Sequence, residues 1–324
     1  MKKITFKLLA LMLILSLTFG LAACAPKAES APEPQPAVSE TPAVEEPAPE
    51  VDVLADVVNS YYANMPQDVY KISEKDFVEL VKSNNTDIFI LDIRQPDVYG
   101  EGHIKGAVNA PYGMAIIESL DKLPKDKTIM LYCYTGQTAG QTVALLNMAG
   151  FDAKSVNLGW NLGISKVEGV ADVIETQAND FPQVTPLDIK PEVKAAIEAF
   201  YKGLADVKGT TYTNYMISED DAKALLDAKD DSIIFLSVRK AEDYAKGHIE
   251  GAVNIPWGKG MQEQFGTLPK DKKIAVYCYT GQTANQTVAG LRLLGYDAVS
   301  LKNGMGMPSN APNGWANKGF PVVQ

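Results

Sequence analysis

The sequence predicts an α/β protein with two tandem domains, each a parallel β-sheet with helices on both faces. First, several motifs recur at a constant separation of 145 residues, which is the size of a domain and too long for a solenoid repeat. Second, short apolar β-rich segments alternate with segments of helical spacing in each copy. Strands that alternate with helices are typical of a parallel sheet between two helical layers.

The repeat contains no insertion between its motifs. The first copy is expected over residues 51–181 and the second over residues 182–324, because prolines at 182, 186 and 191 mark the join. The matching motifs are residues 90–94 with 235–239, residues 102–109 with 247–254, and residues 132–139, which recur unchanged as 277–284.

Local patterns predict the elements of each copy in order. Each copy begins with a helix, and a second helix follows an N-cap serine, Ser73 or Ser218, with acidic residues in its first turn. Two buried strands and a long helix that stops at Gly150 or Gly295 follow. The expected helices are 56–63, 137–148, 193–204 and 282–294, and the expected strands are 87–92, 128–132, 232–237 and 273–277.

The N-terminus has the pattern of a secretory signal. Lysines at positions 2, 3 and 7 precede an apolar run over residues 8–21, which is too short to span a membrane comfortably. The run ends in Leu-Ala-Ala-Cys24, which resembles the lipobox of bacterial lipoproteins. This resemblance implies removal of residues 1–23, a lipid on the sulfur of Cys24, and export to the outer face of the cytoplasmic membrane. The alternative is an ordinary signal peptide with a chance cysteine.

The segment after Cys24 is predicted to be a tether. Residues 24–50 are rich in Ala, Pro, Glu and Ser, a composition that cannot bury a core and stays extended. It would hold the two domains away from the membrane.

Composition excludes several functions. The net charge of −10 over 324 residues argues against a nucleic-acid partner. The three cysteines are too few for a disulfide-built domain. Cysteines and histidines do not cluster at zinc-ligand spacing, so no metal or organic cofactor is expected.

Cys133 and Cys278 are the candidate nucleophiles. Each directly follows an apolar strand and precedes a helix, so backbone N–H groups and the helix N-terminus converge on the sulfur and favour a thiolate. The alternative is an inert buried cysteine. A cysteine-dependent phosphatase would need an arginine six positions later, where this chain has Ala139 and Ala284. The candidate substrate-binding loops are Tyr134, Thr135, Gly136, Gln137 and Thr138, and Tyr279, Thr280, Gly281, Gln282 and Thr283.

Both copies resemble the rhodanese family. The shared pattern is an Asp-x-Arg strand end, an acidic-aromatic stretch, Gly-His-Ile-x-Gly-Ala-x-Asn-x-Pro, and the cysteine loop. The resemblance implies a sulfurtransferase in which the cysteine takes sulfane sulfur from a donor such as thiosulfate or polysulfide and passes it to cyanide or a thiol. The matching residues are Asp92, Arg94, Asp97, Tyr99, Gly102, His103, Gly106, Ala107, Asn109, Pro111 and Cys133, and Arg239, Glu242, Tyr244, Gly247, His248, Gly251, Asn254, Pro256 and Cys278.

The resemblance also implies supporting roles for several polar residues. Asp92, Arg94, His103, Arg239 and His248 are expected to be structural. The arginines are expected to be buried pairing groups, with Asp97 and Glu242 as candidate partners, and a general-base role for the histidines is the less favoured alternative. The aromatic residues Tyr112 and Trp257 either rim a pocket or pack, and Trp160 and Trp315 are expected in a core or on the surface.

Three departures from the family pattern keep other functions open. Ser237 replaces the aspartate that Asp92 provides in the first copy. Neither cysteine loop contains Arg or Lys, which weakens the case for thiosulfate, and both copies carry a cysteine although two-domain enzymes of the family keep it in the second domain only. The second hypothesis is an extracytoplasmic persulfide or polysulfide carrier that serves a membrane sulfur-metabolising enzyme. The third is a disulfide between Cys133 and Cys278.

Overall fold

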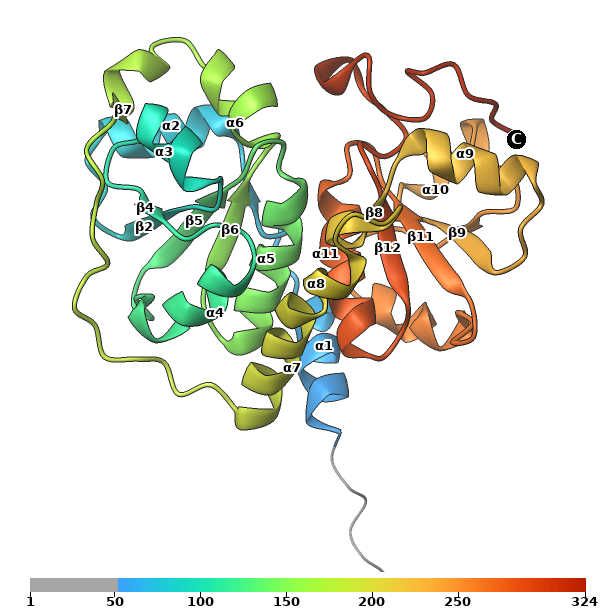
Figure 1. Cartoon of the computed structure of the whole chain (residues 1–324), viewed down its shortest axis with the longest axis horizontal. Helices are drawn as coiled ribbons and strands as arrows, with labels where there is room; N and C mark the ends of the chain where they lie inside the picture. The colour runs from blue at the N-terminus through green and yellow to red at the C-terminus, as the bar shows by residue number, and fades with distance from the viewer. Residues whose placement is uncertain (1–51) are drawn as a thin grey trace, which may run out of the picture. The chain divides into compact units, whose positions relative to one another are not determined.

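The sequence repeat folds twice into the same parallel sheet. The computed structural model describes residues 52–324, so the expected signal peptide, Cys24 and the tether up to residue 50 lie outside the described residues. The sheets have the strand orders β1-β6-β5-β2-β4 and β8-β12-β11-β9-β10, so corresponding strands occupy corresponding places (Figure 1). The predicted fold class is confirmed. The strands are β1 Lys71–Ile72, β2 Ile88–Asp92, β4 Val108–Asn109, β5 Thr128–Tyr132 and β6 Ala153–Val156, and β8 Met216–Ile217, β9 Ile233–Ser237, β10 Val253–Asn254, β11 Lys273–Tyr277 and β12 Ala298–Leu301.

The helices begin and end close to the predicted positions. Ser73 and Ser218 each cap a helix by accepting a hydrogen bond from the backbone of the third residue that follows, at 3.0 and 3.1 Å. Gly150 closes α5 with a φ of 103°. No helix within residues 52–324 is long and apolar enough to cross a bilayer. The helices are α1 Val53–Ala63, α2 Glu74–Lys82, α3 Pro96–Glu101, α4 Met114–Ser119, α5 Gln137–Ala149, α6 Gly159–Leu162, α7 Pro191–Lys202, α8 Leu204–Val207, α9 Glu219–Asp227, α10 Ala241–Lys246 and α11 Gln282–Leu293.

Helices cover both faces of the first sheet, as the alternation of side chains along β2 requires. Phe89 and Leu91 belong to the core that includes α5, whereas Ile90 packs in a separate core with Phe77 of α2 and Tyr99 of α3. Because both faces are buried, the strand is apolar along its length.

The two copies share one core at the face that carries the long helices. Helices α5 and α11, which follow the two cysteines, pack against each other (Figure 1). A Cβ atom on Gly140 of α5 would lie 2.5 Å from the carbonyl oxygen of Gln282, so the glycine permits this close approach. The leading helices cross to the other copy: Tyr62 of α1 contacts Trp257, and Tyr201 of α7 contacts Tyr112. Both cysteine loops therefore lie beside the boundary between the copies.

Candidate active site

Each candidate nucleophile lies where a central strand ends and the interface helix begins. Cys133 follows β5 and Cys278 follows β11, and both are free cysteines with 2% exposure. The Sγ of Cys133 accepts hydrogen bonds from the backbone N–H groups of Gly136 and Ala139, at 3.2 and 3.4 Å. The Sγ of Cys278 accepts one from Gly281, at 3.1 Å. The structure therefore has the cradle of backbone donors that the sequence predicts, and it has no disulfide between these two residues.

Glycines fix the shape of both loops. Gly136 and Gly281 have φ values of 81° and 90°, which most side chains disfavour. Gly159 and Gly304 lie behind the loops, and a Cβ on either would come 2.5 Å from the carbonyl oxygen of Cys133 or Cys278. The cysteine backbone is thus held between its own helix and the loop after the next strand.

Side chains of the two loops reach across the boundary between the copies. The Gln137 side chain accepts a hydrogen bond from the backbone N–H of Asn303 at 2.9 Å and donates to its side chain at 3.2 Å. The Gln282 side chain of the second copy likewise accepts a hydrogen bond from the backbone N–H of Leu158 in the first copy, at 3.1 Å. These two side chains bind the partner copy, and substrate binding by the loops remains a prediction.

A cavity of about 210 Å³ opens on Cys278 and is formed by both copies. Lys71 reaches it from β1 of the first copy, and Lys240 borders it from the second. Neither cysteine loop contains a cation, and these two lysines could not be predicted because neither lies near a cysteine in the sequence. The remaining lining residues are Val238, Trp257, Tyr279, Thr280, Gln282 and Thr283.

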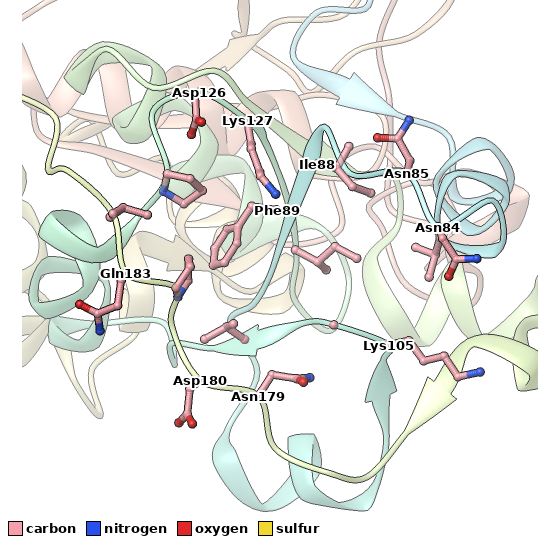
Figure 2. A pocket seen from close by; sticks show the side chains of 17 residues that line it. Asn84, Asn85, Ile88, Phe89, Lys105, Asp126, Lys127, Asn179, Asp180 and Gln183 are labelled. Atoms are coloured by element: carbon pink, nitrogen blue, oxygen red, sulfur yellow. The ribbon is translucent and has the colours of Figure 1, made fainter.

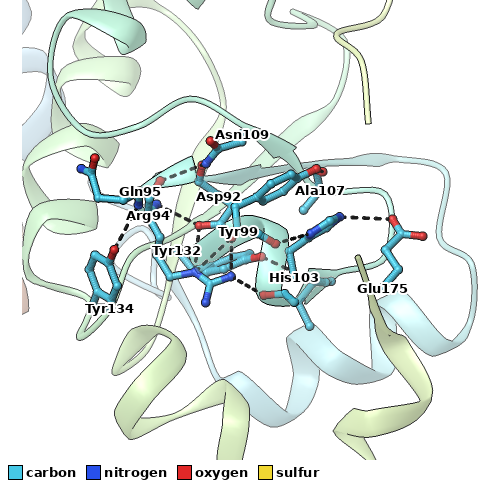
Figure 3. Close-up of polar contacts among 12 residues, drawn as sticks. Asp92, Arg94, Gln95, Tyr99, His103, Ala107, Asn109, Tyr132, Tyr134 and Glu175 are labelled. Atoms are coloured by element: carbon cyan, nitrogen blue, oxygen red, sulfur yellow. Dashed lines mark hydrogen bonds and ion pairs between the residues drawn. The ribbon is translucent and has the colours of Figure 1, made fainter. Parts of the chain in front are cut away.

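An ion pair buried behind the first loop joins Asp92 to Arg94 (Figure 3). The Arg94 guanidinium lies 2.6 Å from the carboxylate, and both side chains are at most 1% exposed. Arg94 also donates to the carbonyl of Gly102 at 2.8 Å and lies 4.0 Å from the ring centroid of Trp160. The expected pairing of Arg94 with Asp97 is wrong, because Asp92 at the strand end directs its carboxylate to the same guanidinium.

The second copy lacks this ion pair because Ser237 stands in place of the aspartate. Arg239 donates to the carbonyl of Gly247, and its Nε is buried without a partner among the described residues. No ion pair between Arg239 and Glu242 occurs within residues 52–324, so that expectation is also wrong. The two loops therefore rest on different supports.

The histidines bind backbone groups. His103 is fully buried, stacks on Tyr99 and is hydrogen-bonded to the Tyr99 carbonyl at 2.8 Å, and its Nε2 lies 3.7 Å from the Glu175 carboxylate (Figure 3). The same Nε2 is hydrogen-bonded to the carbonyl of Gln177 at 3.1 Å. It lies in β3 (His103–Ile104), which forms an unpredicted antiparallel pair with β7 (Ile174–Glu175). His248 stacks on Tyr244 in the same way. These contacts support the structural role that the sequence predicts.

The aromatic residues divide between packing and lining. Trp257 does both, since it lines the Cys278 cavity and packs on Tyr62. Tyr112 packs on Tyr201, and burial raises its pKa well above the ordinary value. Trp315 is fully buried, and Trp160 lies partly exposed beside Arg94.

A larger cavity in the first copy lies apart from both cysteines. It encloses about 650 Å³, and its lining includes Phe89, Lys105 and Asn179 but neither cysteine (Figure 2). Two of its polar side chains already have partners: Lys105 donates to the carbonyl of Asp172 at 2.7 Å, and Asn179 donates to that of Ala107 at 3.1 Å. Without a nucleophile, this cavity is a weaker candidate for chemistry.

Two sulfurtransferases and one solved structure are similar to parts of this chain. A sulfurtransferase of Allochromatium vinosum is 27% identical over 111 residues, which are 33% of this chain and 96% of that protein. The thiosulfate sulfurtransferase PspE of Escherichia coli is 34% identical over 73 residues, 22% of this chain and 69% of its own. The solved structure of a rhodanese-related protein from Thermoplasma volcanium is 29% identical, covers 33% of this chain and 96% of its own, and has a TM-score of 0.29.

The family itself is shown by matches in both copies. The sequence model of the rhodanese-like domain matches residues 73–165 and again residues 218–306. Together these two segments make up more than half of the 324 residues, and each contains one cysteine loop. The chain therefore belongs to the rhodanese-like domain family and contains two copies of that domain.

Proposed function

We propose that the protein is a sulfurtransferase that carries sulfane sulfur as a persulfide on Cys133 and Cys278. The observation that carries the proposal is the hydrogen bonding of each buried sulfur to loop N–H groups at a helix N-terminus. Such donors stabilise negative charge on a thiolate and equally on the terminal sulfur of a persulfide. The names of the sulfurtransferase relatives add support.

The proposed reaction is a double displacement. The cysteine thiolate attacks the sulfane sulfur of thiosulfate or a polysulfide, a bond forms between Sγ and that sulfur, and the donor's own sulfur–sulfur bond breaks. The leaving group departs with the electron pair. A thiol or cyanide then attacks the terminal sulfur and regenerates the thiolate, so neither a metal nor an organic cofactor is needed.

The experiment is to treat the full chain with thiosulfate or polysulfide and then alkylate, digest and weigh the peptides that contain each cysteine. Cys133→Ser and Cys278→Ser serve as matched controls for each other. We expect one reducible sulfur on each remaining loop cysteine. Absence of added sulfur on both peptides, with the thiols free and the fold intact, contradicts the proposal. Loading without release to cyanide or a thiol would support the carrier function instead.

We further propose that the chain is exported and anchored by a lipid on Cys24, where it meets small sulfur anions and a membrane sulfur-metabolising enzyme. The support is the basic, apolar and Leu-Ala-Ala-Cys pattern of the N-terminus. Intact mass of the protein from a membrane fraction is the test. Loss of residues 1–23 and a diacylglycerol adduct are expected, and Cys24→Ala must abolish both.

A further inference from the structure

The Cys278 cavity contains a cation that the second domain does not supply by itself. Lys71 belongs to β1 at the edge of the first sheet, yet it lines the cavity that opens on Cys278. The Lys71 side chain is partly buried there, and burial lowers its pKa while the charge of Cys278 acts in the opposite direction. Lys71 and Cys278 therefore line one small cavity, and its lining within the described part of the chain includes no carboxylate.

The same positions of the other copy carry no charge. Lys71 pairs with Ser155 along the sheet, and Met216 pairs with Ser300 in the equivalent place. Lys240, the second cation of the cavity, corresponds to Gln95. The loop residues of the cavity are identical in both copies, so among the residues that line the Cys278 cavity the charged ones, Lys71 and Lys240, are replaced by uncharged residues in the other copy.

Such a difference selects among sulfur donors. A cation in a partly buried cavity attracts an anion more strongly than the same cation in water, because the effective dielectric constant there is lower. It also stabilises charge that collects on a leaving group. A site with lysines therefore favours a negatively charged donor. An equivalent site with Met and Gln does not favour a charged donor over an uncharged one.

We propose that Lys71, together with Lys240, makes Cys278 the acceptor of sulfur from small dianionic donors such as thiosulfate, with Cys133 limited to less charged donors. This proposal rests on the proposed sulfur transfer. In the step at Cys278, a bond forms between Sγ and the sulfane sulfur while the sulfur–sulfur bond of thiosulfate breaks. Sulfite leaves as a dianion with the electron pair, and Lys71 binds its developing charge. The active site for this donor is therefore complete only when both domains are present.

The test compares two donors at one cysteine. In the full chain with Cys133→Ser, the rate at which the Cys278 peptide gains sulfane sulfur is measured with two donors. Thiosulfate leaves a persulfide on Cys278 and releases sulfite, whereas uncharged dimethyl trisulfide leaves a methyl trisulfide on Cys278 and releases methanethiolate. Lys71→Met, which copies the residue at position 216, should reduce the thiosulfate rate about tenfold or more relative to the trisulfide rate, as loss of a partly desolvated charge contact predicts. Lys71→Arg should recover most of the lost rate.

Lys208→Met is the matched control, because it removes the same charge from an exposed position outside the cavity. It should leave both rates unchanged. An unchanged ratio of the two rates in Lys71→Met overturns this inference while sulfur transfer stands. Failure of the parent protein to load from either donor overturns the proposed function instead. Thermal unfolding of each variant shows whether a reduced rate results from a loss of folded protein.

Discussion

Replacement of Asp92 by serine should destabilise the protein strongly, because it leaves a buried guanidinium without its counter-ion. Asp92 and Arg94 are at most 1% exposed, and their side chains lie 2.6 Å apart. The carboxylate also accepts a hydrogen bond from the backbone N–H of Arg94 at 2.9 Å. The variant gives the first copy the residue that Ser237 provides in the second, so serine is compatible with the fold at this position.

The expected loss follows from the burial of the pair. Removal of one partner of a buried ion pair costs about 3–5 kcal/mol, since the remaining charge stays desolvated. At about 2–4 °C per kcal/mol for a protein of this size, the melting temperature should fall by about 6–20 °C. Asp92→Asn keeps the size of the side chain and removes its charge, so it should show most of the same fall.

The second copy provides the reverse experiment. Ser237→Asp offers a carboxylate to Arg239, whose Nε is buried without a partner, and should raise the melting temperature. Differential scanning calorimetry of the three variants and the parent checks these expectations. A fall of less than about 1 kcal/mol for Asp92→Ser would refute the reasoning, because it would mean that Arg94 finds water or another acceptor at no cost.

Two more predictions concern packing and pH. Gly140→Ala should lower the free energy of unfolding by about 1–3 kcal/mol in a urea titration, because the added Cβ meets helix α11 of the other copy. This loss should exceed the gain from the better helix propensity of alanine. Gly100→Ala is the control: Gly100 also lies in a helix, but its Cβ would enter open space, so this variant should not be destabilised. Burial of Glu175 acts to raise its pKa, but hydrogen bonds from Asn179 and Gly106 outweigh this effect. The net result is a pKa lowered from the ordinary value of 4.5. Its stabilising contribution is therefore complete above pH 4.5 and is lost as the pH falls through the lowered pKa. The difference in unfolding free energy between the parent and Glu175→Gln should shrink over that range, and a difference that stays constant would contradict this assignment.

The interior of each domain could be predicted from the sequence because local patterns determine it. Apolar strands, N-cap serines and stop glycines specified the elements, and the repeat showed that they occur twice. The cysteine loops were also predictable, since strand, cysteine, glycine and helix are adjacent in the chain. The partner of Arg94 was not, because Asp92 and Asp97 are both close in sequence and only the direction of their side chains distinguishes them.

The sequence by itself thus determined two rhodanese-like domains with one cysteine loop in each. Only the tertiary structure decided how the copies meet, with α5 against α11 and Gln137 bound to Asn303 of the other copy. It also placed Lys71 at a cysteine about 200 residues away in the chain. Contacts of this kind leave no local pattern, because they depend on the packing of two finished domains and on which side chains that packing brings together.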